Sequence, residues 1–178
     1  KTKSNFFMVA KDKIGWQTMQ DNASGCALSH QKIWSMISQG DKKYGVIFED
    51  DALPLFYKKK IYDDFFNKIE RIAVNVDIVF LSNRRPTRPL ISVFSLSSSM
   101  NLSAIKYSGI GAESYVITKN AAKSLGRLQN KCDFEVDCLL QHWWRHGLSV
   151  LHLSPAIFGE DGRASTIGYT NDLPRWPN

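Results

Sequence analysis

An unbroken apolar run that ends in three acidic residues most constrains how this chain can fold. Residues 44–48 read Tyr-Gly-Val-Ile-Phe, and Glu49, Asp50 and Asp51 follow directly. A short continuous apolar run of this kind predicts a β-strand that is buried on both faces of a sheet. The three carboxylates then lie at the carboxyl end of that strand, which is the edge where open α/β sheets bind their ligands.

The acidic triplet has two interpretations. Side chains alternate along a strand, so Glu49 and Asp51 are predicted to point the same way and Asp50 the opposite way. Three adjacent carboxylates repel one another unless a cation or open water screens them, and a divalent cation that also binds substrate phosphates uses one or two carboxylates. A solvated acidic turn after a core strand explains the same residues equally well, so the rest of the chain has to decide.

Length and composition predict one domain, residues 1–178, which is long enough to bury a core. The net charge of +6, from 23 Lys and Arg against 17 Asp and Glu, permits nucleic acid, a phosphorylated sugar or an acidic membrane surface as a partner without choosing among them. No apolar run reaches the roughly eighteen residues of a membrane span. Three cysteines without metal-ligand spacing fit a reducing compartment better than a disulfide framework.

The order of the predicted elements indicates an α/β fold. Apolar runs predict strands at residues 5–10, 44–48, 77–82, 114–118 and 149–153, and apolar stripes predict helices at residues 26–39, 56–72, 120–128 and 134–146. A strand, a helix and a strand at this spacing predict a parallel βαβ crossover. We therefore expect a mainly parallel, Rossmann-type sheet with helices on both faces, and loops at residues 83–101 and from residue 159 onward.

Two motifs in a fixed order carry a resemblance to a known family. The hexamer Gly25-Cys-Ala-Leu-Ser-His30 precedes the strand that ends in Glu-Asp-Asp by about twenty residues, and further matches lie at residues 77–81, Gly109-Ile-Gly111, Val136-Asp137-x-x-Leu140, Pro155 and residues 165–167. The chain resembles glycosyltransferase family 25, which includes bacterial lipooligosaccharide galactosyltransferases and collagen β-galactosyltransferase domains. The resemblance covers roughly residues 6–167. Family members usually open with a strand and turn ending in Asp-Arg, and this first strand is expected to be absent here.

The resemblance implies a GT-A-like fold and a donor site for a UDP-sugar, with galactose as the first expectation. It implies Mn²⁺ or Mg²⁺ as cofactor, with Asp51 as the first ligand and Glu49 as the second. The residues that it implies for donor binding are Asp50, Gly25, Ser29 and His30. Without the motif, His30 would be a hydrogen-bonded core histidine, because it shares a helical stripe with Cys26 and Ile33.

The family resembles inverting transferases, which need a carboxylate to deprotonate the acceptor hydroxyl. Asp137 is the candidate base, because it lies at the margin of an apolar helical stripe and should be partly buried. Glu135 is the second candidate. The alternative is that Asp133, Glu135 and Asp137 only favour the positive end of a helix near its start.

Two further sets of residues are candidates for binding. Arg84 and Arg85 follow a predicted buried strand and are assigned to phosphates of an anionic glycolipid or oligosaccharide acceptor, with an ordinary basic loop as the alternative. His152 is a candidate third metal ligand. His142 and His146 have the spacing of a metal pair, although a solvated helix face explains them better because no third zinc-type ligand accompanies them.

The predicted function is metal-assisted, inverting transfer of a hexose from a UDP-sugar to a lipooligosaccharide or lipopolysaccharide glycan. Such an enzyme would act in the bacterial cytoplasm, with peripheral association at the inner face of the inner membrane. The alternative is a non-catalytic basic module that binds anions or nucleic acid. No nucleic-acid motif is present, so we expect no nucleic-acid partner. A third possibility is a hydrolase that uses Glu49 and Asp137 as a carboxylate pair.

Overall fold

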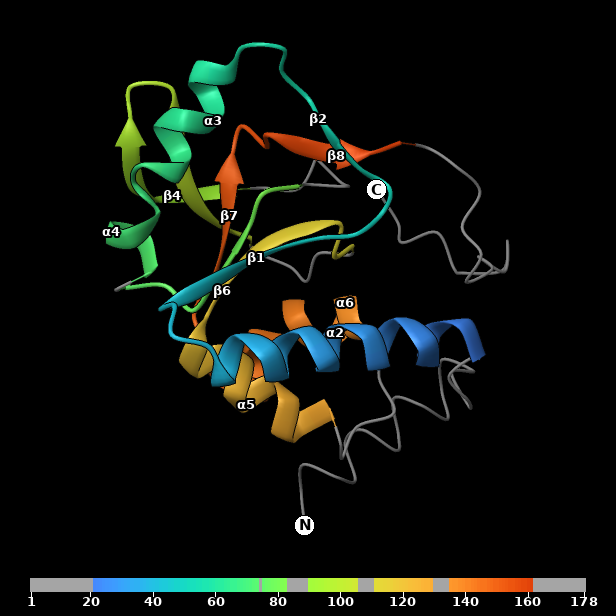
Figure 1. The fold of residues 1–178 in the computed structure, drawn as a ribbon. Coiled ribbons are helices and arrows are strands. Elements are labelled where there is room, and N and C mark those ends of the chain that lie inside the picture. Colours follow the sequence, from blue (N-terminus) through green and yellow to red (C-terminus); the bar gives the residue numbers. More distant parts are fainter. Residues whose placement is uncertain (1–20, 74, 83–89, 106–110, 130–134, 162–178) are drawn as a thin grey trace, which may run out of the picture.

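The computed structural model describes residues 21–73, 75–82, 90–105, 111–129 and 135–161 (Figure 1). The predicted strand at residues 5–10 and the arginines Arg84 and Arg85 lie outside these ranges. The elements are α2 (Asp21–Gln39), β1 (Tyr44–Phe48), β2 (Ala52–Pro54), α3 (Lys59–Phe66), α4 (Ile69–Ala73), β3 (Ile78–Phe80), β4 (Leu90–Ser97), β5 (Met100–Ile105), β6 (Ser114–Thr118), α5 (Lys119–Gln129), α6 (Val136–Gln141), α7 (Trp143–His146), β7 (Val150–Ser154) and β8 (Phe158–Glu160).

Six of the strands form one sheet in the order β1-β6-β3-β7-β5-β4. Its neighbours β3 and β7 are parallel, and the other four described pairs are antiparallel. The α/β class is thus confirmed, while the mainly parallel arrangement holds only for the β3–β7 pair. The predicted crossover from β1 to β3 does join two strands that run in one direction. However, β6 lies between them and is antiparallel to both, which sequence periodicity cannot reveal.

The apolar run that dominates the sequence is not the centre of the described sheet. β1 is the last strand in the described order, its Ile47 is buried, and Phe48 is 45% exposed. The strands that are buried along their whole length are β3 and β6. The prediction of two-face burial for β1 was therefore wrong. An apolar run indicates that a strand can bury much of its surface. The position of that strand in the sheet depends on which other strands pair with it.

Helices cover both faces of the sheet, as predicted. On one face α2, α5 and α6 pack against the sheet around Trp34, Phe80 and Tyr115. On the other face α3 and α4 contribute Phe65 and Ile72 to a second core. Figure 1 shows these two groups of helices on opposite sides of the strands. The helices of these two groups bury apolar residues against the sheet, which gives a three-layer arrangement.

The helix boundaries differ from the predicted ones. α2 begins at Asp21, whereas the predicted helix begins at residue 26. The single helix expected at residues 56–72 is divided into α3 and α4. The helix expected at residues 134–146 is broken between α6 and α7, where His142 has φ −86° and ψ 65°. Apolar stripes continue across such breaks, so periodicity alone does not show them.

Two strand pairs arise in segments that were predicted as loops. The hairpin of β4 and β5 occupies the serine-rich region, and β8 pairs with β2. Irregularly spaced serines obscured the first pair, and three-residue strands carry too little pattern to show the second. The β2–β8 pair matters for the site because β2 directly follows the acidic triplet. Within the described ranges, none of the helices combines the length and apolarity that a bilayer crossing requires.

Candidate functional site

The acidic triplet lies in a turn between β1 and β2. The Glu49 N–H donates to the carbonyl of Glu113 at 2.9 Å, and the Ala52 N–H donates to the Glu49 carbonyl at 3.2 Å. The Asp161 N–H donates to the Asp51 carbonyl at 3.0 Å, which attaches the end of β8 to the same turn. Because β1 ends at Phe48, strand alternation does not determine how the three carboxylates point.

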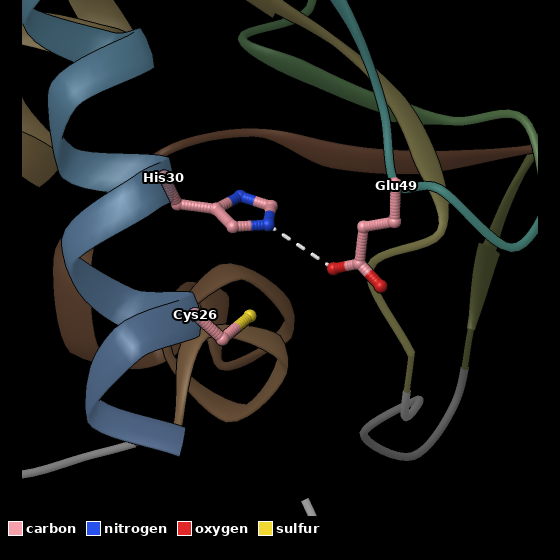
Figure 2. A group of neighbouring side chains, drawn as sticks. All are labelled: Cys26, His30 and Glu49. Atoms are coloured by element: carbon pink, nitrogen blue, oxygen red, sulfur yellow. Dashed lines mark hydrogen bonds and ion pairs between the residues drawn. The ribbon is translucent and has the colours of Figure 1, made fainter. Parts of the chain in front are cut away.

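Helix α2 presents Cys26 and His30 to this turn. The two residues are one helical turn apart and therefore lie on the same side of the helix. Figure 2 shows both side chains directed toward Glu49. The buried His30 ring places Nε2 3.1 Å from Glu49 Oε1, and ligand atoms of Cys26, His30 and Glu49 all lie within 4.8 Å of one another. The tertiary structure thus joins the two halves of the sequence motif.

A buried chain of hydrogen bonds holds His30 in place. The Trp34 Nε1–H donates to the Tyr115 hydroxyl oxygen at 2.9 Å, and that oxygen lies 2.7 Å from His30 Nδ1. Trp34 can only donate and a phenol has one proton. These groups are all satisfied when the Tyr115 O–H donates to Nδ1 and the Nε2–H donates to Glu49. This hydrogen-bond chain therefore fixes the His30 ring, which in turn orients the Glu49 carboxylate.

We expect Tyr115→Phe to lower the free energy of unfolding by about 1–3 kcal/mol, because it leaves the Trp34 N–H and His30 Nδ1 buried without the hydroxyl. Urea denaturation followed by fluorescence measures this change. Tyr57→Phe is the matched control, since the Tyr57 side chain is fully exposed and should tolerate the loss of its hydroxyl. Equal losses in both variants would contradict the role of the buried hydroxyl.

Asp137 lies at the start of α6, and the backbone fixes both of its carboxylate oxygens. Oδ1 accepts from the Cys138 N–H at 2.6 Å, and Oδ2 accepts from the Gly111 N–H at 3.2 Å. The Gln141 side-chain amide donates to the Gly111 carbonyl at 3.0 Å. Gly111 has φ +94°, and a Cβ there would lie 2.5 Å from Glu113 Oε1. The glycine is therefore required where the chain passes α6.

The charges of four carboxylates act on the Cys26 thiol. Burial first, and then the negative charges of Glu49, Asp137, Asp51 and Glu135, raise the pKa of the Cys26 thiol to about 11. These residues come from the turn after β1 and from the start of α6, which are nearly ninety residues apart in sequence. The chain as a whole is positively charged. This region is nevertheless a centre of negative potential that favours a bound cation.

The electrostatics of the region also affect the second candidate base. Desolvation, followed by the charge of Asp137, raises the pKa of the Glu135 carboxyl above its usual value. A carboxylate with a raised pKa holds a proton more readily near neutral pH. The predicted partial burial of Asp137 is present as well. Both carboxylates thus remain candidates for proton transfer.

The other predicted donor-binding residues are more exposed. The Ser29 hydroxyl donates to the Gly25 carbonyl at 2.9 Å, a bond within α2. Gly25 has no heavy atom within 4 Å of a Cβ built on it, so its surroundings are open. Asp50 is exposed in the turn. Donor contact by these three residues stays a prediction.

The other candidate histidines pack against aromatic rings or bond to the backbone. His152 is buried and stacks on Phe80, with ring centroids 4.8 Å apart. His142 stacks on Trp144, and burial lowers the pKa of its imidazole to about 4. His146 Nδ1 accepts from the Leu148 N–H, and its Nε2 lies 3.2 Å from the Leu140 carbonyl. In the described part of the chain, the three-ligand clusters include none of these histidines.

Sequence reasoning assigned no role in the site to Cys26 or to Tyr115. For Cys26 the available signal was its helical spacing from His30. Tyr115 gave no such signal, because its place beside His30 depends on the pairing of β6 with β1.

The fold and the site define an α/β protein with a candidate ligand-binding site at an acidic turn after a strand. A comparison with known families then identifies the family. The sequence model described as glycosyltransferase family 25 (LPS biosynthesis protein) matches residues 1–140. The chain belongs to this family, and the resemblance inferred from its motifs is confirmed.

Two relatives are similar to this chain. Procollagen galactosyltransferase 1-A of Xenopus laevis is 28% identical over 120 residues, which cover 65% of this chain and 18% of the relative. A provisionally assigned glycosyltransferase of Haemophilus influenzae is 27% identical over 165 residues, which cover 87% of this chain and 54% of the relative. The chain thus matches less than two thirds of the length of either relative.

Proposed function

We propose that this protein transfers a hexose from a UDP-sugar to a hydroxyl group of a lipooligosaccharide or lipopolysaccharide glycan, with inversion at the anomeric carbon. Galactose is the hexose that we propose first. The observation that carries the proposal is the acidic turn of Glu49 and Asp51 in a member of this family, with His30 bonded to Glu49. The charges of Glu135 and Asp137 act on the same Cys26 thiol as the charges of this turn. Galactose is supported by the name of the Xenopus relative, and the glycan acceptor by the description of the family.

The carboxylates of Glu49 and Asp51 suit the proposed metal. Mn²⁺ and Mg²⁺ prefer oxygen ligands and commonly bind through one or two carboxylates, with substrate phosphates completing the shell. Backbone hydrogen bonds fix the turn that carries both residues, and His30 orients Glu49. When bound, the cation neutralises the charge that develops on the departing diphosphate. The proposed ligands are Asp51 first and Glu49 second.

Asp137 is the proposed base. Its carboxylate is held by two backbone N–H groups, so it is oriented before any acceptor binds. In the proposed reaction it takes the proton of the acceptor hydroxyl as the oxygen attacks the anomeric carbon. Glu135 lies beside it and is the second candidate. The negative centre needs a cation nearby before an anionic donor can approach, which couples donor binding to the metal.

The proposed acceptor follows from the phosphate-binding chemistry of two arginines. Arg84 and Arg85 are proposed to bind phosphates of an anionic glycolipid or oligosaccharide, because a guanidinium group pairs with a phosphate through two hydrogen bonds. Such an acceptor would place the enzyme peripherally at the inner face of the bacterial inner membrane, where nucleotide sugars are accessible. The alternative of a non-catalytic anion-binding module is less well supported, because the gathered carboxylates repel anions.

Calorimetric titration with UDP and UDP-galactose, with Mn²⁺ or after chelation, tests the proposal. We expect binding that requires the metal and that weakens by more than about tenfold in Asp51→Ala, which loses a proposed ligand. Asp41→Ala is the matched control, because Asp41 is an exposed carboxylate at the opposite end of β1 and should bind like the wild type. Binding that is indifferent to both metal and Asp51 would remove the carboxylates from the donor site.

A further inference from the structure

We propose that Cys26, His30 and Glu49 form a binding site for a divalent cation of zinc type. The three residues offer a thiolate, an imidazole nitrogen and a carboxylate oxygen, which are the ligand types that zinc takes in proteins. A sulfur ligand distinguishes this set from the all-oxygen shell of Mg²⁺ and shifts preference toward softer ions. Nothing in the family description or in the names of the relatives assigns such a site.

The geometry of the site requires only a small contraction. The ligand atoms lie within 4.8 Å of one another, with His30 Nε2 and Glu49 Oε1 already 3.1 Å apart. Zinc binds nitrogen and carboxylate oxygen at about 2.0–2.2 Å and sulfur at about 2.3 Å, so the three atoms must move slightly inward. Cys26 and His30 are on one rigid helix. Glu49 is on a turn, and its side chain has three rotatable bonds that allow this movement.

The buried hydrogen-bond chain can support the metal-bound form. A metal on Nε2 needs the imidazole proton on Nδ1, which then donates to the Tyr115 oxygen. A phenol oxygen has two lone pairs and can accept from both His30 and Trp34, and the Tyr115 O–H then gives up its bond to Nδ1. Such outer partners usually orient histidine ligands. When the Cys26 sulfur binds the cation as a thiolate, the thiol proton leaves to solvent.

The second three-ligand cluster of the described residues is less suitable. It consists of Glu135, Asp137 and Cys138. Both oxygens of Asp137 already accept backbone N–H groups, and the Cys138 side chain is buried in the core. A cation there would have to displace these hydrogen bonds. The cluster around Cys26 is partly accessible, and the surrounding carboxylates attract a cation to it.

Glu49 is shared between this site and the proposed Mn²⁺ or Mg²⁺ site. If the proposed function holds, zinc occupancy withdraws Glu49 from the donor site and inhibits the transferase. This consequence rests on the proposed function, whereas the binding site itself does not. The test therefore uses the protein without any nucleotide or sugar.

The experiment titrates the full chain with Co²⁺, a spectroscopic substitute for zinc, and then displaces it with Zn²⁺. The variant Cys132→Ser/Cys138→Ser retains Cys26 as its single thiol. We expect this variant to show a thiolate-to-cobalt charge-transfer band that Zn²⁺ removes. Cys26→Ser should lose the band and bind Zn²⁺ about tenfold more weakly or worse, while its circular dichroism remains that of the wild type.

Two results would overturn the site. One is the absence of the charge-transfer band from Cys132→Ser/Cys138→Ser, and the other is its persistence in Cys26→Ser. Retention of metal-dependent UDP binding in a protein without the cobalt band would reject the zinc site and leave the proposed function standing. Cobalt binding through Cys26 without any UDP binding would support the zinc site and count against the proposed function.

Discussion

Asp137→Asn is expected to lower kcat for hexose transfer by about 10²–10⁴-fold, which corresponds to about 2.7–5.4 kcal/mol of transition-state stabilisation. Asparagine retains the size of the side chain and one oxygen that can accept from the Gly111 or Cys138 N–H. It cannot take a proton from the acceptor hydroxyl. Steady-state assays with UDP-galactose and Mn²⁺ measure the effect, and KM for the donor should change little because Asp137 is not a proposed donor contact.

Glu135→Gln is the matched comparison for Asp137→Asn, since it neutralises the neighbouring carboxylate. Desolvation and the charge of Asp137 raise the pKa of Glu135, so it is the competing base. A larger fall in kcat for Glu135→Gln than for Asp137→Asn would transfer the role of base to Glu135. Glu135→Gln should leave the free energy of unfolding near that of the wild type, whereas Asp137→Asn should lower it by up to about 1–3 kcal/mol because one backbone N–H loses its acceptor. Urea denaturation of both variants separates a chemical defect from a folding defect.

Phe65→Ala is expected to lower the free energy of unfolding by about 3–5 kcal/mol. Phe65 is 0% exposed, and it lies in the core between α3, α4 and the sheet, where it contacts Phe66 edge to face. Truncation removes apolar contacts and leaves a cavity in a closely packed layer. Domains of this kind are stable by only about 5–15 kcal/mol, so the loss is a large fraction of the total. Urea denaturation measures it.

Tyr57→Ala is the control for Phe65→Ala, because this aromatic side chain from the same region is fully exposed. Its effect should stay within about 0.5 kcal/mol. A loss below about 1 kcal/mol for Phe65→Ala would show that the second core collapses around the cavity or contributes little. Phe65 lies on the face of the sheet opposite to His30 and Tyr115, so the folded fraction of Phe65→Ala should still bind metal and donor.

The sequence correctly predicted single strands and helices that have a clear apolar pattern within one short segment. The strand at residues 114–118 and the apolar run at residues 44–48 match β6 and β1 residue for residue. The helices on both faces follow from apolar stripes that must be buried against a sheet. The β4–β5 hairpin, the β2–β8 pair and the break at His142 were not predicted, because serine-rich or very short segments carry little periodicity.

The sequence by itself determined the α/β class, the family and the acidic turn, because these depend on residue types and spacing within short segments. Only the tertiary structure decided the strand order, with β6 antiparallel between β1 and β3. Only the tertiary structure brought Cys26 and His30 together with Glu49, and Asp137 together with Gly111. The physical reason is that side chains distant in sequence meet through backbone pairing and packing, and these depend on the whole chain at once. The chemistry of the candidate site is therefore encoded locally, whereas its geometry is a property of the fold.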